Sequence, residues 1–148
     1  VVSEMKSAEA FAAQEAARTG HGVLSTVHSN SCEATYRRFI TLCKQKYDMK
    51  DETLYTLVTE AFPIIVFTRK LDDNSRKIME ITECEILPDG HRSIKTLYRY
   101  NVEDEITDDN GNKKIVGNFE KVNNISKSLQ KRLIDNGCRR KNLEKILR

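Results

Sequence analysis

The sequence predicts an α/β protein with added antiparallel strands and a helical tail. Apolar residues recur at helical spacing in three segments of the first 61 residues, and a short β-branched segment at 22–27 separates the first two. A continuous apolar run at 64–67 then begins a stretch rich in strand-forming residues, and two further helical patterns follow residue 126. The predicted order is therefore β-α-β-α-α, followed by strands and terminal helices.

Cap residues predict where the first helix begins and ends. Ser7 is expected to cap it, and Gly20 is expected to end it in a left-handed conformation. Val1 and Val2, in front of this helix, are expected to complete a buried strand. Glu4 then lies where the strand leaves the sheet, a position from which a carboxylate can face a ligand crevice.

The next elements are predicted in the same way. Residues 22–27 are expected to form a second buried strand. Asn30, with Glu33 three residues later, forms a capping-box pattern and predicts the start of the second helix. A shorter helix precedes Pro63, and the continuous apolar run at 64–67 predicts an interior strand.

The second half is predicted to consist of antiparallel strands and two helices. Strands are expected at 77–86 and 93–100, and a shift of apolar parity between Ile81 and Cys84 indicates a β-bulge. Turn and cap signals separate the remaining elements. These signals lie at 88–90, 108–112, Ser126 and 136–137.

Composition and charge exclude several classes of protein. The 148-residue chain is 39% hydrophobic and 32% charged, and no run approaches the roughly 20 apolar residues of a membrane span. The first residues lack the pattern of a signal peptide, and a net charge of +3 gives no argument for nucleic-acid binding. The charge is uneven, however, with five acidic residues at 103–109 and a net +7 from residue 121 onward. The basic end suits an anionic lipid surface or an acidic partner, or is a solvated helix face.

The cysteines give no sign of a metal site. Cys32, Cys43, Cys84 and Cys138 contain no Cys-x-x-Cys pair, and their spacing fits no common zinc module. They are expected to be reduced thiols of a cytosolic protein.

Residue types suited to phosphate chemistry concentrate before residue 40. Glu4 can hold a metal-bound water or orient an attacking one, or it simply faces solvent at a strand end. His21 and His28 bracket the segment 22–27, and both can donate hydrogen bonds to anionic oxygen. A structural role for either histidine remains the alternative.

Two segments resemble motifs of the secretion and pilus motor ATPases. Residues 1–6, VVSEMK, with Glu9 after them, resemble the Walker B region, although Ser and Lys replace the family's Gly and Arg. Residues 19–30, TGHGVLSTVHSN, resemble the histidine box, and Arg38 stands where the family has an arginine on the next helix. The similarity covers residues 1 to about 100 and is to the tight-adherence pilus and type II/IV secretion ATPases.

The resemblance implies roles for individual residues. Glu4 would be the catalytic, water-polarising glutamate, Glu9 would be a second catalytic acid, and His28 would complete the catalytic set. The implied nucleotide-binding residues are His21, Thr26, Asn30 and Arg38. No residue is implied as a direct metal ligand.

The phosphate-binding loop Gly-x-x-x-x-Gly-Lys-Ser/Thr does not occur in these 148 residues, because no two glycines are five positions apart. The resemblance therefore implies the C-terminal half of a RecA-like P-loop ATPase domain over 1–102. An acidic turn region, a short strand and a basic helical tail would follow over 103–148. The full-length protein is expected to use ATP and Mg²⁺, which this part alone would not bind tightly, and the part alone is expected to be inactive.

The resemblance also implies the setting of the protein. It would form hexamers in the cytoplasm, peripheral to the cytoplasmic membrane, with an inner-membrane platform protein of a secretion or pilus machine and without nucleic acid. The alternative is a non-catalytic module that docks to such a platform protein through the basic tail and the β-rich segment.

Overall fold

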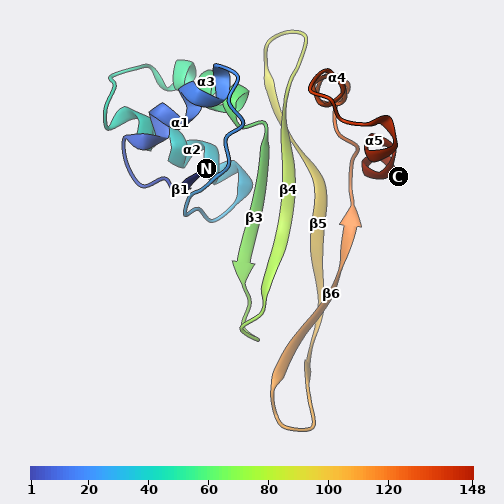
Figure 1. Cartoon of the computed structure of the whole chain (residues 1–148). Coiled ribbons are helices and arrows are strands. Elements are labelled where there is room, and N and C mark those ends of the chain that lie inside the picture. The colour runs from blue at the N-terminus through green and yellow to red at the C-terminus, as the bar shows by residue number, and fades with distance from the viewer. The chain divides into compact units, whose positions relative to one another are not determined.

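The computed structural model describes residues 1–148, except for the side chain of Val2. The chain forms two compact units, Val1–Ile65 and Val66–Arg148, and Figure 1 labels their elements. Together they are a mixed α/β structure, as the sequence predicts. The division expected after residue 102 falls inside a strand of the second unit, and it stays a prediction about the organisation of the ATPase domain.

The first unit consists of three helices and two short parallel strands. In order these are β1 (Val2–Glu4), α1 (Glu9–Arg18), β2 (Ser25–Thr26), α2 (Cys32–Lys44) and α3 (Asp51–Ala61). Each helix contacts the other two, and their apolar stripes form the core. Its largest buried apolar side chains include Tyr36, Phe39, Leu42, Leu54 and Val58.

Two predicted N-caps of this unit are wrong by one residue. The first helix, α1, begins after Ala8 rather than Ser7. The second, α2, begins after Ser31 rather than Asn30, and Ser31 Oγ accepts a hydrogen bond from the N–H of Ala34 at 3.0 Å. At α2, serine and asparagine are both good caps, so the sequence pattern alone does not choose between neighbours. At α1, Ala8 makes no side-chain cap hydrogen bond, so the helix begins there without the cap that the sequence predicts.

The strands of the first unit are shorter and less buried than predicted. Of the strand expected at 22–27, only Ser25–Thr26 pairs. Val1 is 99% exposed, so the buried position predicted for it is wrong. The same prediction for Val2 concerns a side chain outside the described part of the structure.

The second unit is a four-stranded sheet followed by two helices. Its elements are β3 (Ile64–Lys70), which begins in the first unit, β4 (Arg76–Ile86), β5 (Arg92–Thr107), β6 (Lys113–Lys121), α4 (Lys127–Asp135) and α5 (Arg140–Leu147). The strands lie in chain order, and β5 is antiparallel to β4 and to β6. The interior strand predicted at 64–67 is an edge strand, because only β4 pairs with it among the described residues.

Local signals in the sheet are confirmed. The register of β4 with β5 shifts between Ile81 and Thr82, within the segment where the apolar parity indicates a bulge. Gly90 and Gly111 lie in the β4–β5 and β5–β6 turns with φ of +85° and +79°, a region open to glycine without strain.

Asp73 ties the β3–β4 turn to the start of β6. Its Oδ1 accepts from the N–H of Ser75 and its Oδ2 from the N–H of Ile115, both at 2.9 Å. The Ser75 side chain and these backbone donors favour the ionised form and lower the pKa of Asp73 to about 2. The carboxylate thus fixes the turn against a strand 42 residues later.

Gly117 marks a close approach between β5 and β6. A Cβ atom at this position would lie 2.1 Å from the carbonyl oxygen of Asn101 and 3.0 Å from the ring of Tyr100. We expect Gly117→Ala to lower the free energy of unfolding by about 1–3 kcal/mol, because the strands would have to move apart. Urea denaturation measures the change. In Gly22→Ala, where a Cβ meets no atom within 4 Å, we expect a change of no more than about 0.5 kcal/mol. Equal stability of the two variants would contradict the close approach.

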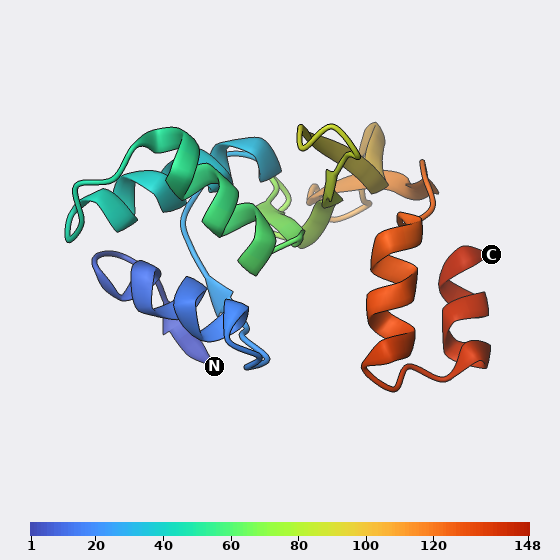
Figure 2. The same cartoon turned by 90° about the horizontal axis from the view of Figure 1, so that it is seen from above.

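The two terminal helices lie side by side (Figure 2), and their apolar side chains pack against Leu97 of the sheet. Ser126 caps α4 as predicted, with Oγ accepting from the N–H of Leu129 at 3.0 Å, and Gly137 follows the helix with a φ of +87°. The core here is built on Leu97, Ile125 and Leu143, and Ile81, Tyr98, Leu129, Leu133, Cys138 and Leu147 pack against it. Among the described residues, no helix has the length and apolar character needed to cross a membrane.

Candidate functional site

The parallel pair of β1 and β2 brings Glu4 and His28 together. Glu4 ends β1 opposite Thr26, and His28 follows β2 two residues later. Glu4 Oε1 lies 3.1 Å from His28 Nε2, and Glu4 Oε2 lies 2.9 Å from Lys6 Nζ. The Glu4 side chain is 28% exposed and that of His28 is 93% exposed. A partly sheltered carboxylate therefore holds an imidazole that remains open to a ligand, an arrangement able to orient water or bind an anion.

Thr26 fixes the strand that carries Glu4. The N–H of Met5 donates to the carbonyl oxygen of Thr26 at 2.8 Å, and Thr26 Oγ1 donates to the carbonyl oxygen of Ser3 at 2.5 Å. The Met5 side chain is buried, and its burial anchors the end of β1. Thr26 thus holds the backbone on both sides of Glu4, and a direct contact with nucleotide stays a prediction.

Glu9 orders the connection between β1 and α1. Its Oε1 accepts from the N–H of Lys6 at 2.6 Å and of Ser7 at 3.0 Å. The backbone donors of Lys6, Glu9 and Ser7 hold the pKa of Glu9 below its ordinary value. The carboxylate also lies in the first turn of α1, where the helix dipole favours negative charge. It supports the loop directly after Glu4, and the catalytic role implied by the resemblance stays a prediction.

The other predicted residues lie at exposed positions, and no described contact joins them to this pair. The side chains of His21, Asn30 and Arg38 are exposed, and the contacts described for the chain include no hydrogen bond or ion pair from them to Glu4 or His28. The backbone N–H of His21 donates to the carbonyl oxygen of Ala16 at 3.1 Å, which continues the end of α1. Their roles in nucleotide binding stay predictions.

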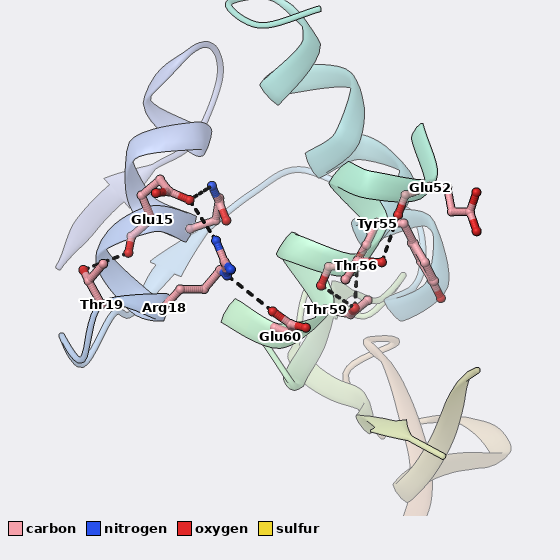
Figure 3. A network of polar contacts seen from close by, with 9 residues as sticks. Glu15, Arg18, Thr19, Glu52, Tyr55, Thr56, Thr59 and Glu60 are labelled. Carbon is pink, nitrogen blue, oxygen red and sulfur yellow. Dashed lines mark hydrogen bonds and ion pairs between the residues drawn. The ribbon is translucent and has the colours of Figure 1, made fainter. Parts of the chain in front are cut away.

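A polar network holds the end of α1, directly before the segment that resembles the histidine box (Figure 3). Arg18 lies between two carboxylates, with Nη1 3.1 Å from Glu15 Oε1 and Nε 3.4 Å from Glu60 Oε2 on α3. Thr19 Oγ1 donates to the carbonyl oxygen of Glu15 at 2.9 Å, and Gly20 then turns the chain with a φ of +95°.

Sequence reasoning does not identify Arg18 and Glu60 as positioning residues, because they are 42 positions apart and belong to different helices. Each alone is typical of a solvated helix end. One clue to a role for Arg18 is its place in the last turn of the predicted helix, because the helix dipole favours a positive charge there.

The cysteines lie outside this site. Cys32, Cys43 and Cys84 are buried and Cys138 is partly buried. Burial raises the pKa of Cys43 to about 11, so its thiolate is scarce at neutral pH. Among the described residues, no group of three or more His, Cys, Asp or Glu side chains could hold a metal ion.

Comparison with known proteins assigns the chain to a family. The sequence model of the family described as "Type II/IV secretion system protein" matches residues 1–145, which spans both units. A comparison with curated proteins found no match. The matched range contains Glu4 and His28, together with the sheet and most of the helical tail. The chain therefore belongs to the type II/IV secretion system protein family.

Proposed function

We propose that these residues form the C-terminal part of a RecA-like motor ATPase that powers protein secretion or pilus assembly. One observation carries the proposal: in a chain of this family, a Glu4 carboxylate oxygen lies 3.1 Å from His28 Nε2 across the parallel strands. Carboxylate and imidazole at neighbouring strand ends are suited to phosphoryl transfer, which depends on positioning and on neutralising charge.

In the proposed reaction, Glu4 orients the water that attacks the terminal phosphate. His28 donates to Glu4 through Nε2, and Lys6 holds the second carboxylate oxygen at 2.9 Å. A phosphate near the exposed His28 ring would be a second anionic partner for the imidazole, which would alter the contact with Glu4. The pair would thereby connect the phosphate state to the position of β1 and β2.

The described residues fit a supporting role toward Mg²⁺ rather than direct ligation. Bound MgATP would supply the phosphoryl group that is transferred. Mg²⁺ keeps several waters and binds one or two carboxylates with the substrate phosphates. Both oxygens of Glu4 already contact a side-chain nitrogen, one of Lys6 and the other of His28, so this single carboxylate fits contact with a metal-bound water.

We propose that sequence outside these residues supplies the phosphate-binding loop, since the pattern Gly-x-x-x-x-Gly-Lys-Ser/Thr does not occur within them. The 148 residues alone would then bind ATP weakly and hydrolyse it negligibly. The complete ATPase would work as a cytoplasmic hexamer at the membrane, with an inner-membrane platform protein.

The two histidines should differ in their effect on kinetics. In a protein that supplies the phosphate-binding loop, we expect His28→Ala to lower kcat for ATP hydrolysis about 10- to 100-fold, because Glu4 loses a donor. His21→Ala should mainly raise KM, since His21 has no described contact with Glu4. Phosphate release measured across ATP concentrations separates the two effects.

The outcome against this proposal is a wild-type kcat in His28→Ala with the fold intact by circular dichroism. Turnover by the 148 residues alone, abolished by Glu4→Gln, would contradict the proposed need for a separate phosphate-binding loop.

The alternative function is a non-catalytic module that docks to the platform protein. The basic helices α4 and α5 favour this alternative, because a basic surface can dock to a partner without any bound nucleotide. The reading frame of the full-length gene discriminates between the two proposals. A phosphate-binding loop upstream of residue 1 supports the ATPase, and a frame without the loop would leave only the docking module.

A further inference from the structure

We infer that the outer surface of α4 and α5 binds an anionic lipid bilayer. This surface, here called the basic face, consists of Lys127, Lys131, Lys141, Lys145 and Arg148. The inference rests on the proposal that the protein works at the membrane, and it names the surface that would make the contact. It does not depend on ATP chemistry.

The basic face lies opposite the side of each helix that packs on the sheet. Leu129 and Leu133 of α4, and Leu143 and Leu147 of α5, belong to the apolar cluster around Leu97. Residues two positions apart on an α-helix point about 200° apart, so a residue two positions before or after a packed leucine points away from the core.

All members of the basic face follow this rule except Arg148, which lies one turn after Lys145. The lysine pair of α4 and the pair of α5 each flank their packed leucines, and all five side chains belong to exposed residues.

The charge of this face is largely uncompensated. Lys131 Nζ pairs with Asp135 at 2.6 Å. For Lys127, Lys141, Lys145 and Arg148, the described contacts include no ion pair with an acidic side chain, although Glu144 lies between them in sequence. Each basic residue close to an anionic membrane contributes about 1 kcal/mol to binding. Four available charges are therefore enough for reversible association.

The helical pair is held firmly enough to present these charges together. Tyr98 Oη donates to the carbonyl oxygen of Ile146 at 3.4 Å, and Lys121 Nζ donates to the same oxygen at 2.9 Å. At the other end, Glu83 of β4 accepts from the N–H of Ser126 at 2.8 Å. Because the backbone is already ordered, binding would cost the entropy of the lysine side chains but not of the helices.

Two features favour a lipid surface over an acidic protein. Ile134 and Ile146 are 43% and 37% exposed on the same helices, and apolar side chains among lysines are typical of helices that lie in a membrane interface. The acidic segment 103–109 lies toward the β5–β6 turn, at the far end of the sheet from α4 and α5 (Figure 1). The second unit therefore has a charge asymmetry that would orient it, with the basic face toward the bilayer and the acidic turn away.

Co-sedimentation with vesicles tests the inference. The full 148-residue chain is mixed with vesicles of phosphatidylcholine containing 30% phosphatidylserine, and with vesicles of phosphatidylcholine alone, at about 0.1 M salt. We expect binding only to the anionic vesicles. The combined variant Lys141→Gln, Lys145→Gln and Arg148→Gln should lower the partition coefficient about 10- to 100-fold.

A charge-matched control separates the surface from the net charge. The variant Lys46→Gln, Lys50→Gln and Lys70→Gln removes the same three charges from exposed residues outside α4 and α5, and it should bind nearly as the parent does. Circular dichroism checks that both variants remain folded.

Three results would overturn the inference: no dependence on phosphatidylserine, equal losses in the two variants, or binding to a polyglutamate peptide without binding to vesicles. The last result would assign the basic face to an acidic protein partner. None of these results bears on the ATPase proposal, which the phosphate-release assay tests separately.

Discussion

Glu4→Gln is expected to lower kcat for ATP hydrolysis by about 10²- to 10³-fold in a protein that supplies the phosphate-binding loop. The amide keeps the size of the side chain but cannot accept a proton from water, and it loses the negative charge that faces Lys6 Nζ and His28 Nε2. Because β1 is held through Met5 and Thr26, the backbone should stay in place. Phosphate release under saturating ATP measures kcat, and thermal unfolding checks the fold.

Glu33→Gln is the matched control for this experiment. Glu33 is an exposed carboxylate on α2 that pairs with Arg37 one turn later on the same helix, and it has no described contact with Glu4 or His28. Its replacement should leave kcat within about twofold, since exposed ion pairs of this kind contribute little. If Glu4→Gln and Glu33→Gln hydrolysed ATP at the same rate, Glu4 would not be the catalytic carboxylate.

Elements set by local chemistry could be predicted from the sequence. Gly20 and Gly137 end helices with positive φ, and Ser126 caps α4, because each signal depends only on neighbouring residues. The caps of α1 and α2 were predicted only to within one residue. For α2 the neighbours Asn30 and Ser31 offer similar capping chemistry, whereas α1 begins after Ala8 without a side-chain cap, so a cap signal alone does not fix the first helical residue.

Strand position in a sheet could not be predicted in the same way. A run of four apolar residues at 64–67 is typical of an interior strand, yet β3 lies at the edge of its sheet. Strand order depends on which segments pair over long distances in sequence, and the apolar pattern carries no information about it. For the same reason, the two-residue length of β2 could not be derived from the β-branched segment around it.

In the candidate site, too, the sequence could indicate some features, whereas the contacts that depend on tertiary packing could not be predicted. The sequence predicts that Glu4 and His28 each follow a short strand, and the pairing of β1 with β2 places them 3.1 Å apart. The contact of Glu9 with the backbone of Lys6 and Ser7 could not be derived, because an acid three residues after Lys6 suits either a site or a loop. Arg18 and Glu60 meet only through the packing of α1 on α3.

The importance of Glu83 for stability could not be predicted from the sequence. In the sequence of β4, Glu83 and Glu85 are two residues apart, an alternation typical of a solvated sheet face. In the structure Glu83 is 2% exposed, and its carboxyl group accepts from both the N–H and the hydroxyl of Ser126. The same Ser126 hydroxyl caps α4, so one buried contact joins the sheet to the helical pair.

We expect Glu83→Ala to lower the free energy of unfolding by about 2–4 kcal/mol, measured by urea denaturation. The change removes two hydrogen bonds and leaves the buried N–H of Ser126 without its acceptor, which costs more than the loss of the bond itself. Glu83→Gln retains one acceptor oxygen of similar geometry, so its loss should be smaller, about 1–2 kcal/mol.

Glu85→Ala is the appropriate comparison, because Glu85 lies on the same face of β4 two residues later and pairs with Lys95 at 3.1 Å. Its partial exposure limits the value of that pair, and we expect a cost below about 1 kcal/mol. The order Glu83→Ala, Glu83→Gln, Glu85→Ala, from most to least destabilising, follows from burial and from the number of donors left unpaired. If Glu83→Ala were no more destabilising than Glu85→Ala, the attachment of α4 would depend on the apolar cluster of Leu97, Ile125 and Leu143 alone.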